Sequence, residues 1–225
     1  MTPSELSVWR KGERARLLKE RETLTGEALA ALRRRIDHHL ERAFADWAHG
    51  ILAFCWPHRN EYDFRHLAAA LRRRGASTAL PVVVAPKSPL IFREWAPGVE
   101  LAKGPLGIAY PVDSPELIPD HVLLPMLGWD GDGYRLGYGG GFFDRTLASL
   151  AKRPQVIGLA YEQAYLPTIH PQPHDIPMDF VVTERGVYRR EPQGLKFLDN
   201  PQAFSSPPCY ASEIAPDYFG EEPKS

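Results

Sequence analysis

The stretch Arg135-Leu-Gly-Tyr-Gly-Gly-Gly-Phe-Phe-Asp-Arg145 carries four glycines within five positions and has an arginine at each end. Glycines this dense adopt backbone angles closed to other residues and leave main-chain N–H groups accessible to a ligand. Phe143, Leu147 and Leu150 follow at helical spacing, which predicts a helix that begins where the glycines end. The N-terminus of a helix favours an anion, and guanidinium groups suit phosphate. The stretch therefore predicts a nucleotide-phosphate site, with a glycine-rich surface loop as the alternative.

Short continuous apolar runs lie on both sides of this stretch and predict buried strands. They occupy residues 51–56, 80–85, 90–95, 122–126 and 156–160, and the last strand is expected at 180–183. Helical patterns cover residues 4–24 and 29–47 before the first run and 62–74 after it, the latter with Asn60 as its N-cap. This alternation predicts a single α/β domain with a mostly parallel, doubly wound sheet, helices on both faces and an N-terminal helical pair.

The domain is expected to span residues 1–195, because residues 196–225 are rich in proline and serine and predict an extended or disordered tail. Ligands of doubly wound sheets bind beyond the carboxyl ends of the strands, near the point where the strand order reverses. The loop at Glu61, the glycine stretch and the loop at 163–179 all follow predicted strands. We therefore expect these three segments to converge on one site.

Composition excludes several classes of protein. The 225 residues are 44% hydrophobic and 24% charged, and the net charge of −1 gives no field that would attract nucleic acid. Arginine clusters at 33–35 and 72–74 raise an RNA-binding hypothesis, which is disfavoured because no aromatic platform accompanies them. The two cysteines form no disulfide framework, and no apolar run reaches the length of a membrane span. These features predict a cytoplasmic protein with neither a nucleic acid nor a membrane as partner.

The carboxylate of Asp144 lies beside the predicted phosphate site, where a cation would offset its repulsion of bound phosphates. Magnesium is held by one or two carboxylates together with phosphate oxygens, so Asp144 is a candidate ligand, with Asp175 or Asp179 as the second acid. The alternative for Asp144 is an acid in the first helical turn that stabilises the helix dipole. A zinc site at His170 and His174 is disfavoured, because no cysteine is near and prolines interrupt the segment.

The glycine stretch is similar to the RLGxGxGYYDR signature of the 5-formyltetrahydrofolate cyclo-ligase family, also called methenyltetrahydrofolate synthetase. The resemblance extends over residues 5–190 in the same order. Further short elements of the family are matched in order. Arg10 to Arg14, with Arg21, resemble the N-terminal pattern that touches ATP, and residues 57–61 resemble the loop that carries a substrate-binding glutamate. Residues 107–111 resemble the GIPEP element, residues 129–135 resemble the FDxxGxR turn, and residues 161–163 and 174–175 resemble two later short elements.

The resemblance implies a single α/β domain that binds ATP and magnesium and acts on a reduced folate. The implied reaction converts 5-formyltetrahydrofolate to 5,10-methenyltetrahydrofolate and releases ADP and phosphate. By position, the residues implied for ATP are Arg10, Arg14, Arg135, Leu136, Gly137, Tyr138, Gly139, Gly140, Gly141, Phe142 and Phe143. Those implied for the folate are Trp56, Glu61, Tyr138, Gly139, Gly140, Gly141 and Phe142. Asp144 and Asp175 are the implied magnesium ligands, and Glu61 and Arg145 the catalytic residues. The oligomeric state stays open, and a monomer is one possibility.

Four departures from the family pattern bear on the function. Ala76 replaces a lysine, Tyr110 replaces the acid of GIPEP, and Phe142 and Phe143 replace two tyrosines. They keep a second hypothesis open, in which the chain is a non-catalytic or altered-substrate relative that binds a nucleotide or folate without the family's turnover.

Overall fold

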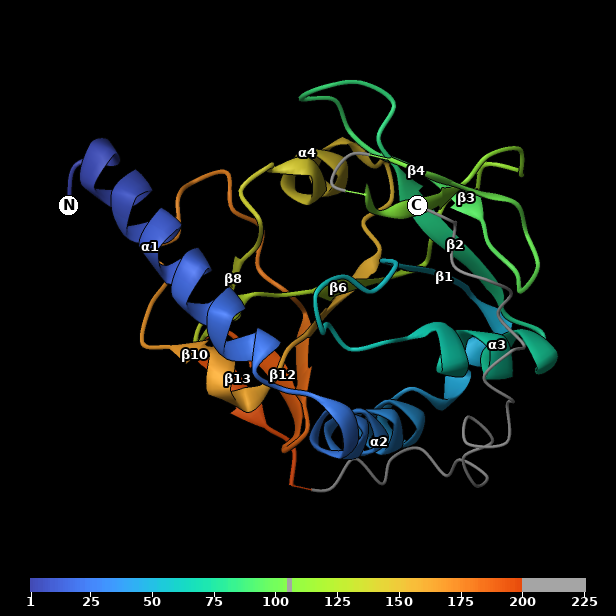
Figure 1. Cartoon of the computed structure of the whole chain (residues 1–225), viewed down its shortest axis with the longest axis horizontal. Coiled ribbons are helices and arrows are strands. Elements are labelled where there is room, and N and C mark those ends of the chain that lie inside the picture. Colours follow the sequence, from blue (N-terminus) through green and yellow to red (C-terminus); the bar gives the residue numbers. More distant parts are fainter. Residues whose placement is uncertain (105–106, 200–225) are drawn as a thin grey trace.

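The computed structural model of the chain describes residues 1–104 and 107–199 (Figure 1). Among these residues, the main sheet has eight strands in the order β13-β12-β11-β9-β6-β1-β2-β3. Their bounds are β1 Ile51–Phe54, β2 Ser77–Val82, β3 Ile91–Glu94, β6 His121–Pro125, β9 Gln155–Leu159, β11 Phe180–Thr183, β12 Gly186–Glu191 and β13 Gly194–Phe197. The tail expected after residue 195 falls mainly on residues 200–225, which lie outside the described part of the chain.

The centre of the sheet is parallel and its edges are antiparallel. Strands β2, β1, β6, β9 and β11 pair in parallel, whereas β3 at one edge and β12 and β13 at the other run antiparallel to their neighbours. From β1 the chain builds outward to β2, and from the adjacent β6 it builds the opposite way to β9 and β11. The strand order therefore reverses between β1 and β6, and the prediction of a mostly parallel, doubly wound sheet is confirmed.

Helices cover both faces of this sheet because its central strands are apolar on both sides. The helices are α1 Pro3–Glu22, α2 Gly26–Ala43, α3 Arg65–Arg73 and α4 Phe142–Ser149, with short 3-10 turns η1 Ala45–His49 and η3 Glu162–Ala164. Successive strand residues point to opposite faces. Leu52 and Phe54 of β1 thus pack in the cluster that includes α2 and α3, while Ala53 packs in the cluster with Leu147 of α4. Figure 1 shows α4 on one side of the strands and α2 and α3 on the other.

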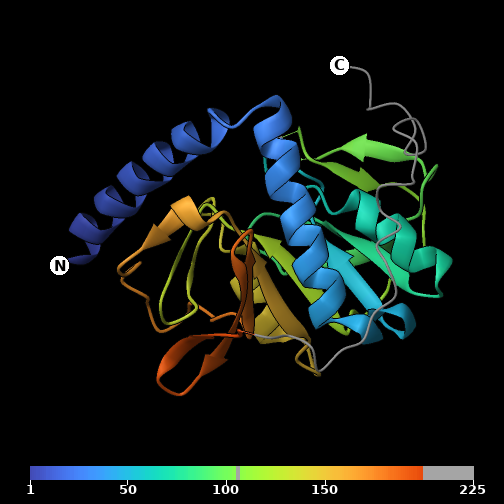
Figure 2. The same cartoon turned by 90° about the horizontal axis from the view of Figure 1, so that it is seen from below.

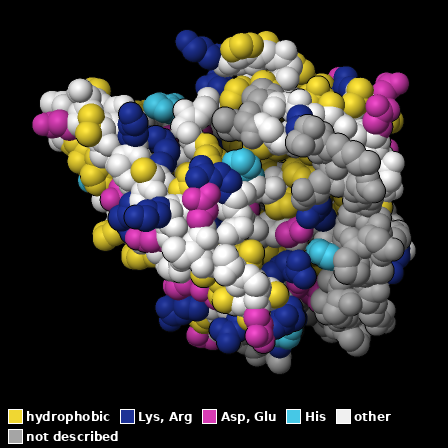
Figure 3. Space-filling view, in the orientation of Figure 1, with side chains coloured by type: hydrophobic (Ala, Val, Ile, Leu, Met, Phe, Trp, Pro, Cys, Tyr) yellow, Lys and Arg dark blue, Asp and Glu magenta, His cyan; other side chains and the backbone are white. Residues whose placement is uncertain are grey.

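Helix α1 leaves the body of the protein at an angle to α2, and its N-terminal end reaches farthest from the sheet (Figure 2). Its last turns pack on the sheet through Leu17, which is buried. On the face shown in Figure 3, basic and acidic side chains of the described residues are interspersed. In the described ranges no helix combines the length and the apolar character that crossing a bilayer requires.

A small sheet, β10-β7-β8, leads into the glycine stretch. Its strands are β7 Gly128–Asp130, β8 Arg135–Leu136 and β10 Tyr165–Leu166, and a separate hairpin pairs β4 Leu101–Lys103 with β5 Ala109–Pro111. The buried carboxylate of Asp130 accepts hydrogen bonds from the backbone N–H groups of Asp132, Tyr134 and Ile169. Asp130 therefore fixes the turn before the glycine stretch and fastens to it the loop that follows β10.

Two expectations about element boundaries are wrong. Residues 180–183 are not the last strand, because β12 and β13 add an antiparallel hairpin that extends the sheet to Phe197. These strands lie at an edge and are half exposed, so they carry no continuous apolar run. The helix expected at 62–74 begins at Arg65 and has no side-chain cap, because the Asn60 amide donates instead to the Leu24 carbonyl, 2.8 Å away.

Candidate active site

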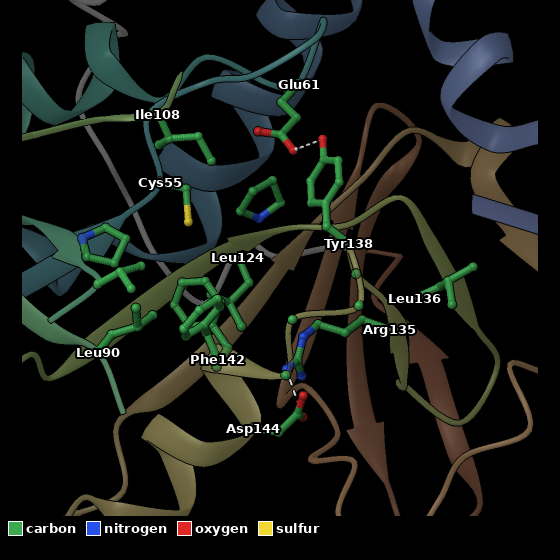
Figure 4. A pocket seen from close by; sticks show the side chains of 18 of the residues that line it. Cys55, Glu61, Leu90, Ile108, Leu124, Arg135, Leu136, Tyr138, Phe142 and Asp144 are labelled. Atoms are coloured by element: carbon green, nitrogen blue, oxygen red, sulfur yellow. Dashed lines mark hydrogen bonds and ion pairs between the residues drawn. The ribbon is translucent and has the colours of Figure 1, made fainter. Parts of the chain in front are cut away.

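A cavity of about 280 Å³ opens at the carboxyl ends of β1 and β6, where the strand order reverses (Figure 4). Cys55 and Trp56 follow β1, Pro125 ends β6, and all three line the cavity. The carboxyl edge at such a reversal is the place where doubly wound sheets bind ligands. The topology thus creates the cavity, and the loops supply its chemistry.

The cavity gathers side chains from α1, the loop after β1, the glycine stretch and the loop after β10. The residues expected at the site that line it are Arg10, Arg14, Trp56, Glu61, Arg135, Leu136, Gly137, Tyr138, Gly139, Gly140, Gly141, Phe142, Phe143, Asp144 and Asp175. The three segments that we expected to converge therefore do so.

The glycine stretch runs from β8 into α4, and Gly141 is the N-cap of that helix in the left-handed conformation, with φ 61°. The helix predicted after the glycines is confirmed. Gly139 also has a positive φ, 95°, and a Cβ atom there would lie 3.2 Å from Cζ of Arg14. A Cβ on Gly140 would lie 2.8 Å from the Phe142 ring. Gly139 and Gly140 are thus required because neighbouring side chains pack directly against bare backbone.

Two arginines of α1 reach the cavity from the side of the glycine stretch. Arg14 Nε donates to the Gly137 carbonyl at 2.7 Å, and Arg10 Nη2 donates to the Asp175 carboxylate at 2.6 Å. Burial, and next the charge of Arg10, lower the pKa of Arg14. Because two guanidinium groups crowd one wall of the cavity, an anion bound between them would be stabilised.

Asp144 and Asp175 are both tied to arginines and lie near each other. Arg135 Nη2 is 2.8 Å from Asp144 Oδ1, and the same carboxylate accepts the N–H of Ile176, the residue after Asp175. Within residues 1–104 and 107–199, no three or more histidine, cysteine or acidic side chains form a group that could hold a metal by themselves. Two carboxylates on the wall of a cavity that can receive phosphate groups nonetheless suit magnesium, which completes its shell with phosphate oxygens and water.

Glu61 is buried and contacts the glycine stretch. Its Oε1 accepts a hydrogen bond of 2.8 Å from the Tyr138 hydroxyl, and its Oε2 accepts one of 3.0 Å from the His58 backbone N–H. Burial raises the pKa of Glu61, whereas the nearby Arg21 guanidinium and the Tyr138 hydroxyl lower it. Figure 4 shows the Glu61 and Tyr138 side chains meeting at the rim of the cavity.

Arg145 is the one expected residue of the site that does not reach the described lining of the cavity. Its Nη2 donates to the Gly140 carbonyl at 2.6 Å, and its guanidinium lies 5.2 Å from the centre of the Phe142 ring. The side chain therefore folds back on the outside of the glycine loop.

Sequence reasoning did not assign the apolar wall of the cavity. Cys55, Leu90, Ile108 and Leu124 line it (Figure 4), together with the Tyr110 ring. Apolar residues of this kind resemble ordinary core residues, and only their positions at strand ends could have indicated a site. Arg21 was grouped with the arginines that meet ATP, but the structure places its guanidinium on Tyr138 and Glu61.

The departures from the family pattern do not all fall on the cavity. Ala76 is buried in the core just before β2 and does not contribute to the described lining. Tyr110, Phe142 and Phe143 do line the cavity. Of the four departures, these three bear directly on what the cavity binds.

Comparison with known proteins bears on the identity of this site. A sequence profile of the 5-formyltetrahydrofolate cyclo-ligase family matches residues 6–184. The chain is 35% identical over 133 residues to the 5-formyltetrahydrofolate cyclo-ligase of Mycolicibacterium smegmatis, covering 54% of this chain and 67% of that protein. It is 34% identical over 136 residues to the Escherichia coli enzyme of the same name, and the match covers 57% of this chain and 74% of that protein.

A solved structure of a protein with this activity is also similar to this chain. The NMR structure of Aquifex aeolicus 5,10-methenyltetrahydrofolate synthetase superimposes with a TM-score of 0.69 at 25% sequence identity, over 85% of this chain and 96% of that one. The profile covers the glycine stretch, the Glu61 loop and the loop that carries Asp175, which are the segments that build the cavity. This chain belongs to the 5-formyltetrahydrofolate cyclo-ligase family.

Proposed function

We propose that the protein catalyses the ATP- and magnesium-dependent cyclisation of 5-formyltetrahydrofolate to 5,10-methenyltetrahydrofolate, with release of ADP and phosphate. The observation that carries this proposal is the meeting of two loops on one cavity. Tyr138 of the glycine stretch donates to Glu61 of the loop after β1 at 2.8 Å, and both line the cavity. A phosphate-binding loop beside a buried carboxylate suits a reaction in which ATP activates a second substrate.

ATP binds through its phosphates to the glycine stretch and to the α1 arginines. Backbone N–H groups at the start of α4 and the guanidinium groups of Arg10, Arg14 and Arg135 favour an anion in the cavity. Phosphoryl transfer needs positioning and charge neutralisation more than covalent help from the protein. Arg145 stabilises the transferred phosphoryl group once its guanidinium leaves the Gly140 carbonyl.

Asp144 and Asp175 are the residues that would hold magnesium. Both line the cavity, and each carboxylate is paired with a guanidinium group. Bound phosphate oxygens can replace the carboxylates as partners of these guanidinium groups, which leaves the carboxylates free to bind the ion. When bound with the nucleotide, the ion supplies further neutralisation of phosphate charge.

The folate occupies the part of the cavity between Trp56, Phe142 and the Glu61 carboxylate. The formyl oxygen attacks the γ-phosphorus of ATP, and ADP leaves. The second folate nitrogen then attacks the activated carbon and loses its proton, and phosphate leaves with the former formyl oxygen. Glu61 accepts a hydrogen bond from the N–H of the attacking nitrogen, which orients that nitrogen and draws off its proton.

The direct test is an absorbance assay of purified protein with 5-formyltetrahydrofolate, ATP and magnesium. Methenyl product should form in the complete mixture and be lost when ATP or the metal is omitted. Absence of product in the complete mixture would contradict the proposal.

Tyr110, Phe142 and Phe143 on the cavity wall support a second candidate, a relative that binds nucleotide or folate without this turnover. Calorimetric titration with ATP, with and without magnesium, separates the two. Binding of ATP without product formation would favour the second candidate.

A further inference from the structure

The Arg21 side chain lies buried at the end of α1, although it carries a charge. Arg21 is 5% exposed, and its Nε donates to the Arg59 carbonyl at 2.9 Å. Its Nη2 donates to the Tyr138 hydroxyl at 2.5 Å and lies 3.6 Å from Glu61 Oε1. A buried guanidinium is tolerated only when it is paired and hydrogen-bonded, and here every partner belongs to the two loops that form the active cavity.

The loop that Arg21 contacts has a strained backbone. Arg59 and Asn60 are both in the left-handed region, with φ values of 49° and 59°, which non-glycine residues keep only when their surroundings impose it. Glu61, the next residue, lines both the active cavity and a second cavity of about 290 Å³. The Glu61 carboxylate between these cavities is held by hydrogen bonds from Tyr138 and from the His58 backbone.

The Tyr138 hydroxyl links the Arg21 guanidinium to the Glu61 carboxylate. The Tyr138 hydroxyl accepts from Arg21 and donates to Glu61, so Arg21 fixes which way that hydroxyl proton points. The other titratable groups that face Glu61 are Cys55 after β1 and Tyr161 after β9, and burial raises the pKa of both. Among the described neighbours of Glu61, Arg21 therefore supplies the charge that favours the ionised carboxylate and opposes the effect of burial on the Glu61 pKa.

We propose that Arg21 is a positioning residue: by binding the Arg59 carbonyl and the Tyr138 hydroxyl, it locks the loop after β1 to the glycine stretch and aims Glu61 at the substrate. This inference rests on the proposed cyclo-ligase function. It assigns Arg21 to the folate side of the cavity, whereas the family pattern groups it with the arginines that touch ATP.

The test compares Arg21→Gln and Arg21→Lys with Arg16→Gln, which removes an exposed arginine of α1 paired to Glu13 and Glu20. ATP affinity is measured by calorimetry without folate, and kcat and KM for 5-formyltetrahydrofolate are measured across a pH series. For Arg21→Gln we expect an unchanged ATP affinity and a loss in kcat/KM of about 10-fold, as for other residues that orient a reacting group. The acid limb of the pH profile should move to higher pH, because loss of the cation raises the pKa of Glu61. In Arg21→Lys the acid limb should lie at a pH between those of the wild type and of Arg21→Gln. Arg16→Gln should behave as the wild type.

Two results would overturn the inference. A loss of ATP affinity that matches the loss in kcat/KM would make Arg21 an ATP contact. An unmoved acid limb, in a variant that is folded but slower, would leave Arg21 with a purely structural role. If Arg21→Gln does not fold, Tyr138→Phe removes the hydroxyl that joins Arg21 to Glu61, and the acid limb should still move to higher pH.

An inactive wild-type protein would refute the proposed function and not the inference about Arg21. In that case the Glu61 carboxyl is titrated by NMR of protein labelled with ¹³C at glutamate, with Glu61→Gln to assign the signal. The pKa of Glu61 should be higher in Arg21→Gln than in the wild type. An equal pKa in the two proteins would overturn the role of Arg21.

Discussion

Arg135 Nη2 lies 2.8 Å from Asp144 Oδ1, so an ion pair joins the strand that enters the glycine stretch to the helix that leaves it. Both side chains are largely buried, and removal of one member of a buried pair leaves an uncompensated charge. The pair closes the loop and also holds a carboxylate on the wall of the cavity. Asp144 therefore has a structural role that can be observed and a proposed role toward magnesium, and the two roles can be separated.

Asp144→Asn removes the negative charge and keeps an oxygen that can accept the Ile176 N–H. If Asp144 holds magnesium, ATP affinity in the presence of the metal should fall about 10-fold, or 1.4 kcal/mol, with little change when the metal is chelated. Calorimetry measures both, and Asp179→Asn is the control, because Asp179 pairs with Arg153 instead. Equal losses with and without magnesium would assign Asp144 to the loop alone.

Gly139→Ala should destabilise the protein by about 1–2 kcal/mol, because alanine resists the left-handed backbone at this position. The new Cβ would also lie 3.2 Å from the Arg14 guanidinium. Gly137→Ala is the matched control, since nothing lies within 4 Å of a Cβ there. Chemical denaturation measures both changes. Equal free energies of unfolding for the two variants would contradict this account of the loop.

Asp37→Asn should make the stability of the protein less dependent on pH. Burial raises the pKa of Asp37 from 3.8 to about 6, and Tyr62 donates a hydrogen bond to its carboxyl. The neutral acid is favoured in the folded state, so its stabilising contribution is complete below about pH 4 and is lost as pH rises through 6. As pH rises across that window, the free energy of unfolding of the variant should increase relative to that of the wild type by up to about 3 kcal/mol. The exposed Asp113→Asn serves as the control, and parallel stability curves for wild type and Asp37→Asn would contradict the prediction.

Glu61→Gln keeps the shape of the side chain and removes its capacity to accept a proton. Methenyl formation should fall about 10²-fold, the usual contribution of a positioned acid or base, while ATP affinity stays unchanged. Burial raises the pKa of Glu61, so wild-type activity should decline as pH falls through that pKa and ionised Glu61 is lost. The variant should lack this acid limb. An unchanged rate would remove Glu61 from the chemistry.

The sequence predicted the centre of the fold better than its edges. Continuous apolar runs revealed the buried strands around Ala53 and Val122, and the glycines revealed the start of α4. The hairpin β12–β13 was missed because edge strands are half polar, as Arg189 and Arg190 are. Family membership was predicted from the glycine stretch and is confirmed by the sequence profile.

The sequence could not predict which partners the arginine side chains contact, because these depend on the direction of each side chain in the folded protein. Arg21 and Arg145 carry the same charge as Arg10 and Arg14, yet Arg21 turns to the Glu61 loop and Arg145 folds onto the Gly140 carbonyl. A motif gives residue types and spacing, whereas hydrogen-bond partners depend on which loops meet in the folded chain. The joining of Tyr138 to Glu61 across 77 positions of sequence is such a meeting.

The central claim is that the formyl oxygen is phosphorylated and leaves as part of the released phosphate. Turnover of 5-formyltetrahydrofolate labelled with ¹⁸O in the formyl group, followed by mass spectrometry of the phosphate, tests this directly. The account predicts one labelled oxygen in the phosphate for each methenyl product formed. Unlabelled phosphate, or product formed without phosphate, would contradict it.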